Sequence, residues 1–154
     1  VYKRQVERPS GTNQVYVQAK NLSETVIEHG LKNVDEVWGI ETHLAFPGLY
    51  GGTADLICVH EGVPAIGDFK TSRKFKKKEW IEDYYLQIAA YAMAHDYVYR
   101  SNIQQGVIMV CTPDLYYQEF KIDGLDLRRA KHNFLKRLDE YYEQDEKEVN
   151  LYGA

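Results

Sequence analysis

Two aspartates and a lysine, Asp55, Asp68 and Lys70, fall on two neighbouring segments that are rich in β-forming residues. Residues 53–60 and 63–70 are predicted to be short strands, and the two residues between them suit a tight hairpin turn. Side chains along a strand alternate between faces, so Asp68 and Lys70 share one face. The hairpin then brings Asp55 on the partner strand close to Asp68.

Two carboxylates on one buried face repel each other unless a cation lies between them. Oxygen ligands favour Mg²⁺ or Mn²⁺ over zinc. A lysine beside such a metal can position a water molecule for in-line attack on phosphorus, while the metal stabilises charge on the phosphate oxygens. The alternative is that Asp68 and Lys70 form an exposed ion pair of about 0–1 kcal/mol with no catalytic role.

A basic run follows Lys70 in a predicted loop. It holds five of the 19 lysines and arginines of a chain whose net charge is -4. Positive side chains interleaved with aromatic ones suit phosphates and stacked, unpaired bases, although a charge run is often only a solvated surface. The predicted nucleic-acid-binding residues are Arg73, Lys74, Phe75, Lys76, Lys77, Lys78 and Trp80.

A long helix is predicted over residues 79–100, with acidic residues in its first turns, where the helix dipole favours them. Gln87 lies among apolar neighbours and needs a hydrogen-bonding partner. Tyr91 follows one helical turn later, on a neighbouring part of the surface. A phosphate or a catalytic carboxylate is a credible partner for the Gln87 amide.

These motifs resemble a known family. GGTADLI, GDFKTS and QIAAY stand in the order and at the spacing of the PD-(D/E)XK nuclease superfamily, in its RecB-like exonuclease branch. The chain is most similar there to the mitochondrial genome maintenance exonuclease and to phage and bacterial exonucleases, over about residues 22–142. The resemblance implies a metal-dependent deoxyribonuclease that hydrolyses phosphodiester bonds.

The resemblance also implies roles for individual residues. Asp55 and Asp68 are metal ligands, with the Phe69 backbone carbonyl as a third, and Lys70 serves the attacking water. The predicted catalytic residues are Asp55, Asp68, Lys70, Gln87 and Tyr91, with Thr71 and Ser72 lining the site. Glu41 and His43 in WGIETHL fit as an acid and a histidine on one strand face, and Glu41 is a further candidate for the metal.

One departure from the family pattern concerns an upstream helix that usually supplies a histidine or glutamate to the metal. Val15 stands where that histidine is expected. Glu24, Glu28 and His29 are the nearby substitutes. The alternative function is therefore a catalytically impaired, nuclease-like DNA-binding module, or a fragment without its upstream metal-ligand helix.

The predicted element order is α-β-β-β-α-β-β-α, an α/β fold with a restriction-endonuclease-like core in which helices flank a mixed sheet. The first twenty residues are expected to form an arm with a short strand at residues 15–17. A helix is expected from Asn21 to Gly30. We expect three segments: an N-terminal arm (1–20), the nuclease-like domain (21–145) and a C-terminal tail (146–154).

Composition bounds the remaining expectations. No apolar run is long enough to span a membrane, and two cysteines cannot supply a four-cysteine iron–sulfur cluster. The expected cofactor is Mg²⁺ or Mn²⁺, and the expected partner is DNA with single strands or free ends, during replication, recombination or repair. A homo-oligomer or a larger nuclease complex is compatible with this pattern, and exonuclease and endonuclease activity both stay open. The expected location is the cytoplasm of a bacterium or phage-infected host, with the mitochondrial matrix as the alternative.

Overall fold

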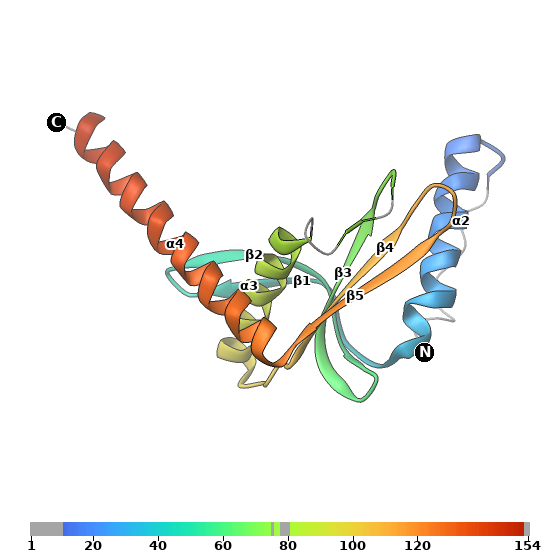
Figure 1. The fold of residues 1–154 in the computed structure, drawn as a ribbon, viewed down its shortest axis with the longest axis horizontal. Helices are drawn as coiled ribbons and strands as arrows, with labels where there is room; N and C mark the ends of the chain where they lie inside the picture. Colours follow the sequence, from blue (N-terminus) through green and yellow to red (C-terminus); the bar gives the residue numbers. More distant parts are fainter. Residues whose placement is uncertain (1–10, 75, 78–80, 153–154) are drawn as a thin grey trace.

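The computed structural model describes residues 11–74, 76–77 and 81–152. One five-stranded sheet runs through the molecule, with helices packed on its two faces (Figure 1). In chain order the elements are α2 (Gln14–His29), the short 3₁₀ helix η1 (Leu31–Asn33), β1 (Val34–Phe46), β2 (Tyr50–His60), β3 (Val63–Thr71), α3 (Glu82–Tyr99), β4 (Gln105–Cys111), β5 (Tyr117–Asp123) and α4 (Gly124–Tyr152).

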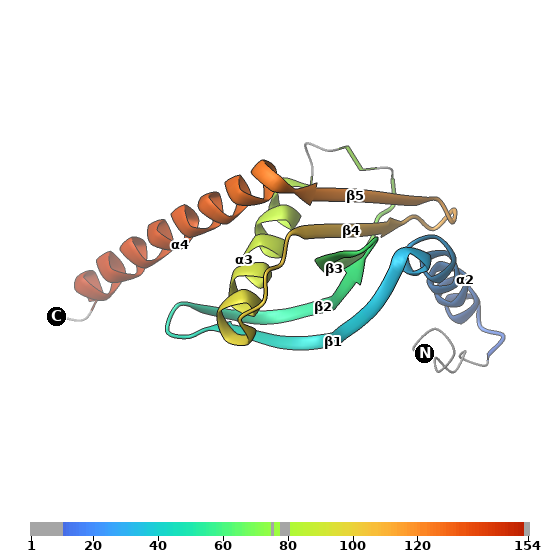
Figure 2. The same ribbon diagram turned by 90° about the horizontal axis from the view of Figure 1, so that it is seen from below.

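The strands lie in the sheet in their chain order, and they are antiparallel except for β3 and β4. Parallel strands need a crossover connection, which α3 provides between β3 and β4 (Figure 2). The sheet is therefore mixed, and the predicted order of helices and strands is confirmed. Every residue of β4 is buried, as expected for a strand that is covered on both faces.

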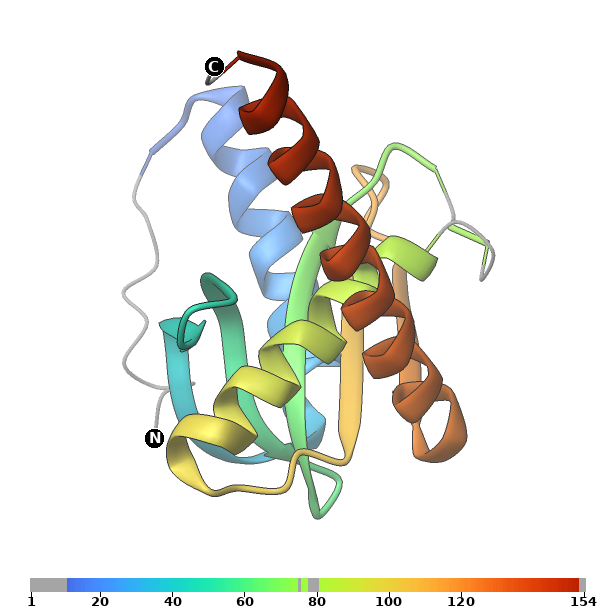
Figure 3. The same ribbon diagram turned by 90° about the vertical axis from the view of Figure 1, so that its left-hand side faces the viewer.

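Each face of the sheet has its own apolar core. Helices α3 and α4 cover one face, where Ile57, Ile66 and Ile108 are buried against α3, and α2 covers the other (Figure 3). On the α2 side, Leu56, Cys58 and their neighbours on β3 and β4 form a smaller cluster. The C-terminal part of α4 continues beyond the sheet (Figures 1 and 2).

The predicted turn between β2 and β3 is formed by Glu61 and Gly62, both with positive φ, at 50° and 78°. Two consecutive positive φ values are typical of the turn that matches the twist of a two-residue hairpin. This turn fixes the register of the two strands, and their last paired residues are Leu56 and Gly67. The residues beyond that pair are Asp55 and Asp68.

The N-terminal prediction was wrong in its details. Helix α2 begins at Gln14, so residues 15–17 are helical and form no strand. The physical reason is the cap: the Asn13 side chain accepts a hydrogen bond from the Val15 backbone N–H at 2.9 Å. The helix ends before Gly30, as predicted. No helix in the described part of the chain is long and apolar enough to cross a membrane.

Candidate functional site

Asp68 and Lys70 form a close ion pair on the face of β3 that is covered by α3. Lys70 Nζ donates a hydrogen bond to Asp68 Oδ1 at 3.0 Å and lies 2.9 Å from Oδ2. The ammonium group also lies 5.2 Å from the centre of the Tyr84 ring on α3, in a cation–π contact. Asp68 is buried, whereas Lys70 stays partly open to solvent. The pair therefore differs from the fully exposed ion pair that was the alternative.

Asp55 lies where β2 stops pairing with β3. Its Oδ2 atom accepts a hydrogen bond from the Phe69 backbone N–H at 2.9 Å. This carboxylate takes the place of a backbone acceptor one step beyond the Leu56–Gly67 pair. The same bond holds Asp55 beside the backbone that joins Asp68 to Lys70.

The short distances between these charged groups affect the pKa of Asp68. Burial raises the pKa of the Asp68 carboxyl above its ordinary value, and the Asp55 carboxylate adds to the rise, whereas Lys70 opposes it. Asp68 Oδ2 is buried and faces the Lys70 ammonium group at 2.9 Å, without a well-aligned hydrogen bond from the described residues. Two neighbouring carboxylates, one of them buried, thus share a single ammonium group, which is a costly arrangement for the protein alone.

A divalent cation fits this arrangement, because its charge would compensate both carboxylates. Asp55, Asp68 and the Phe69 carbonyl are the groups that would hold it. Among the residues that the structure describes, however, no three His, Cys, Asp or Glu side chains are grouped so as to hold a metal. The remaining positions of such an ion would be left to water and substrate.

Glu41, Glu24, Glu28 and His29 therefore do not join the two aspartates in a larger ligand group. Glu41 is exposed and has a positive φ of 50°. The His43 side chain contacts the neighbouring strand β2, where its Nδ1 atom lies 2.8 Å from Thr53 Oγ1. Glu41 and His43 are both exposed on β1, and their shared role on one strand face stays a prediction.

Gln87 and Tyr91 on α3 are hydrogen-bonded to each other, with Gln87 Nε2 donating to the Tyr91 hydroxyl at 3.1 Å. The partner of Gln87 is thus the tyrosine that was predicted beside it, and no carboxylate of the described residues is bonded to the amide. The Tyr91 ring packs against the backbone of β2 at Gly52, where a Cβ atom would meet a ring carbon at 2.8 Å. Gly52 is therefore required for the close approach of α3 to the start of β2.

The basic loop leaves β3 beside this site. The Ser72 backbone N–H donates to the Cys111 carbonyl at 3.1 Å, and the Ser72 hydroxyl donates to the Lys74 carbonyl at 2.7 Å. Further on, the Lys76 backbone N–H donates to Gln118 Oε1 at 2.8 Å, which ties the loop to β5. Thr71 is exposed at the end of β3.

The side chains of Arg73, Lys74 and Lys77 are exposed, and that of Lys76 is half-buried. Phe75, Lys78 and Trp80 lie outside the described residues. Sequence reasoning missed two contacts here, those of Gln118 with Lys76 and of Tyr84 with Lys70. Neither pair is close in sequence, so no local pattern could have revealed it.

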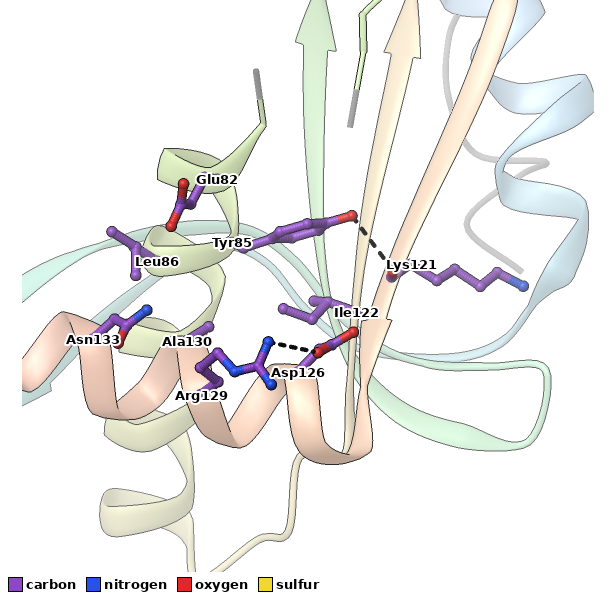
Figure 4. Close-up of a pocket in the computed structure, with 9 residues that line it drawn as sticks. All are labelled: Glu82, Tyr85, Leu86, Lys121, Ile122, Asp126, Arg129, Ala130 and Asn133. Carbon is purple, nitrogen blue, oxygen red and sulfur yellow. Dashed lines mark hydrogen bonds and ion pairs between the residues drawn. The ribbon is translucent and has the colours of Figure 1, made fainter. Parts of the chain in front are cut away.

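A pocket of about 250 Å³ lies elsewhere, between α3, β5 and the start of α4 (Figure 4). The Tyr85 hydroxyl donates to the Lys121 carbonyl at 3.5 Å beside it, and Asp126 pairs with Arg129 at 3.5 Å. None of the predicted site residues lines this pocket. The pocket is lined by Glu82, Tyr85, Leu86, Lys121, Ile122, Asp126, Arg129, Ala130 and Asn133.

Comparison with known proteins gives structural matches alone. No model of a known protein family matches this sequence, and no curated protein does so either. The crystal structure of a "putative exonuclease" from Eubacterium rectale matches with a TM-score of 0.60 and 12% sequence identity, over 92% of this chain and 56% of that one. The crystal structure of SSO0001 matches with a TM-score of 0.43 and 19% identity, over 84% of this chain and 62% of that one.

The chain thus spans little more than half the length of the first of these proteins. At such low identity a match shows the fold and no more. Together with the mixed sheet and its flanking helices, it confirms the predicted α/β fold with a restriction-endonuclease-like core.

Proposed function

We propose that this chain is a metal-dependent deoxyribonuclease that hydrolyses phosphodiester bonds. The observation that carries the proposal is the juxtaposition of Asp55, Asp68 and Lys70 at the point where β2 and β3 separate. Two carboxylates and an ammonium group in this arrangement suit the binding of a metal and a phosphate. The shared fold with a "putative exonuclease" supports the same reading.

Each residue of the site has its own role in the proposed reaction. Asp55, Asp68 and the Phe69 carbonyl would hold Mg²⁺ or Mn²⁺, which would supply positive charge to the phosphate oxygens and favour the ionised form of a water molecule. Lys70 donates hydrogen bonds to the attacking water and to the developing negative charge. Asp68 and Tyr84 hold the Lys70 ammonium from two sides, which limits its conformations. Gln87 and Tyr91 fix α3 against the start of β2.

DNA is the substrate that best suits the surroundings of the site. The exposed cationic side chains of Arg73, Lys74 and Lys77 follow directly after Lys70 and can bind a phosphate backbone. We expect single strands or free ends to be preferred, because a loop that also carries aromatic residues suits unpaired bases. Replication, recombination and repair are the processes that supply such ends.

One observation favours a second candidate. The described residues contain no third acidic or histidine side chain beside the aspartate pair. A nuclease-like module that binds DNA without cutting it would show the same geometry. Such a module would keep the basic loop and have no need of Lys70 beyond its ion pair.

One experiment distinguishes the two candidate functions. The purified chain is incubated with end-labelled single- and double-stranded DNA in Mg²⁺, in Mn²⁺ and in EDTA, and binding is measured in parallel by fluorescence anisotropy. Cleavage that needs the metal and is lost in Asp68→Asn supports the nuclease. Binding without cleavage in any metal supports the DNA-binding module, and the absence of both would overturn the two proposals together.

A further inference from the structure

A second pocket, of about 340 Å³, lies on the α3 side of the sheet, at the C-terminal end of α3. It shares no residue with the aspartate pair, the basic loop or the pocket of Figure 4. Its lining combines three aromatic side chains, two aliphatic hydroxyl side chains and one isoleucine. The lining residues are Trp38, Thr42, Ile57, His95, Tyr99 and Ser101.

The three rings form a group in which His95 is central. The rings of Trp38 and His95 are nearly parallel, with an angle of 17° between their planes and their centres 6.1 Å apart. The centres of the Tyr99 and His95 rings are 4.7 Å apart. Trp38 and Tyr99 remain 43% and 57% exposed, whereas His95 is buried. Two large aromatic side chains thus keep open surface beside a buried polar ring, and that surface can stack on a further flat ring.

The hydrogen bonds of His95 determine which of its nitrogens faces a ligand. Its Nδ1 atom lies 2.7 Å from the Ser101 hydroxyl, and that hydroxyl donates its one proton to Asp96 Oδ1 at 2.8 Å. Ser101 must therefore accept from His95, so Nδ1 carries the proton. The Asp96 carboxylate is itself held by the Ile103 backbone N–H and by Lys131.

The Nε2 atom of the neutral ring is consequently an acceptor. Burial lowers the pKa of His95, which favours the neutral form, although nearby Asp96 opposes this effect. In the part of the chain that the structure describes, no hydrogen bond to Nε2 is formed. An aromatic surface next to an open acceptor is a combination that recognises a flat ring carrying an N–H group.

We propose that this pocket binds an unpaired nucleobase, which stacks on Trp38 or Tyr99 and donates an N–H to His95 Nε2. Arg100 follows Tyr99 directly and is exposed, and its guanidinium lies over the Tyr97 ring, outside the pocket lining, 5.8 Å from the ring centre. The site goes beyond the proposed nuclease reaction, since it binds without a metal and without the aspartate pair.

The test uses the fluorescence of Trp38, one of two tryptophans, in the full chain carrying Trp80→Phe. Deoxyadenosine 5′-monophosphate and 2-deoxyribose 5-phosphate are titrated in EDTA, so that no cleavage occurs. The nucleotide should quench the fluorescence saturably, and the sugar phosphate should not. Equal binding of both probes, or no saturable change with the nucleotide, would overturn the proposal.

Two variants separate the parts of the site. Tyr99→Ala should weaken nucleotide binding by about 5- to 150-fold, the range that corresponds to the loss of one base–aromatic stack. His95→Phe keeps a ring beside Trp38 but removes the acceptor, and it should weaken binding as well. Tyr97→Ala is the matched control, because Tyr97 is an exposed ring of the same helix that packs on Phe46 and does not line the pocket.

Melting curves of each variant establish that it is folded. Unchanged affinity in both Tyr99→Ala and His95→Phe would overturn the proposal even if the nucleotide binds the parent chain. The titrations are made in EDTA, where no cleavage occurs, so failure of the nuclease proposal leaves this test intact. A five-residue oligodeoxyadenylate that binds more tightly than the mononucleotide identifies the ligand as a base within a strand, and equal affinity identifies a free nucleotide.

Discussion

Asp55 Oδ2 accepts a hydrogen bond from the Phe69 backbone N–H at 2.9 Å, one step beyond the last backbone pair of β2 and β3. One oxygen of Asp55 is therefore committed to the fold, and the other remains for a ligand. The same side chain both closes the sheet and enters the candidate metal site. These two roles can be separated by substitution.

Asp55→Asn should abolish cleavage while leaving stability nearly unchanged, because an amide oxygen can still accept from Phe69 but carries no charge. Asp55→Ala should lose cleavage and also about 1–3 kcal/mol of stability, the cost of a backbone N–H left without an acceptor. Urea unfolding in EDTA measures the difference. Equal stabilities of the two variants would show that the hydrogen bond to Phe69 contributes little.

Lys70→Met should reduce the rate of cleavage by about 100-fold or more, the usual effect of removing one donor that stabilises a developing negative charge. It should also destabilise the fold, because Asp68 is then left buried without its cationic partner. Single-turnover cleavage and thermal melting report the two effects. In the double variant with Asp68→Asn, the loss of stability should be partly recovered, and simple additivity of the two changes would argue against the coupling.

Asp68→Asn should raise the melting temperature at pH 7 in EDTA. The folded-state pKa of Asp68 lies above its ordinary value, mainly because of burial. The folded chain therefore holds this proton more tightly than the unfolded chain does, and the parent loses stability as the pH rises from the ordinary value of about 4 through the raised one. For a chain of this size, each 1 kcal/mol corresponds to about 2–4 °C.

The stability gain from Asp68→Asn should shrink at lower pH, where the parent carboxyl is protonated as well. Melting curves at pH 4 and pH 7 check this sign. A variant that is less stable than the parent at pH 7 would mean that the ion pair with Lys70 outweighs the cost of burial.

The basic loop should govern affinity for DNA more than chemistry. Replacing Lys74, Lys76, Lys77 and Lys78 by alanine should weaken binding and reduce the slope of log affinity against log salt. The reason is that fewer phosphate contacts are made, so fewer counterions are released from the DNA on binding. Gln118→Ala is the structural control, because it removes the anchor of the Lys76 backbone and keeps all the charges. An unchanged salt slope in the alanine variant would show that the loop is a solvated surface.

Glu41→Ala tests the ligand set. Since Glu41 is exposed and belongs to no group of three ligands in the described residues, this change should leave the Mg²⁺ concentration for half-maximal cleavage unaltered. Activity is titrated against Mg²⁺ for both proteins. A clear shift toward higher Mg²⁺ would mean that Glu41 moves to the metal when it binds.

Local patterns in the sequence determined much of the fold. The Glu61–Gly62 turn, the alternation along residues 63–70 and the helical spacing around Gln87 led to the right elements in the right order, because each depends on backbone conformations a few residues long. The N-terminal segment was misjudged, since the capping bond of Asn13 outweighed the β-forming residues that follow it.

Contacts between distant residues were decided by the tertiary structure alone. The bond of Asp55 to Phe69, the contact of Lys70 with Tyr84 and the meeting of Trp38 with His95 join elements whose relative positions depend on how the sheet and α3 pack. The φ of 50° at Glu41 is likewise a feature that the local preference of glutamate does not predict. The sequence therefore identified Asp55 and Asp68 as a pair, and the packing of α3 on the sheet determined which side chains surround them.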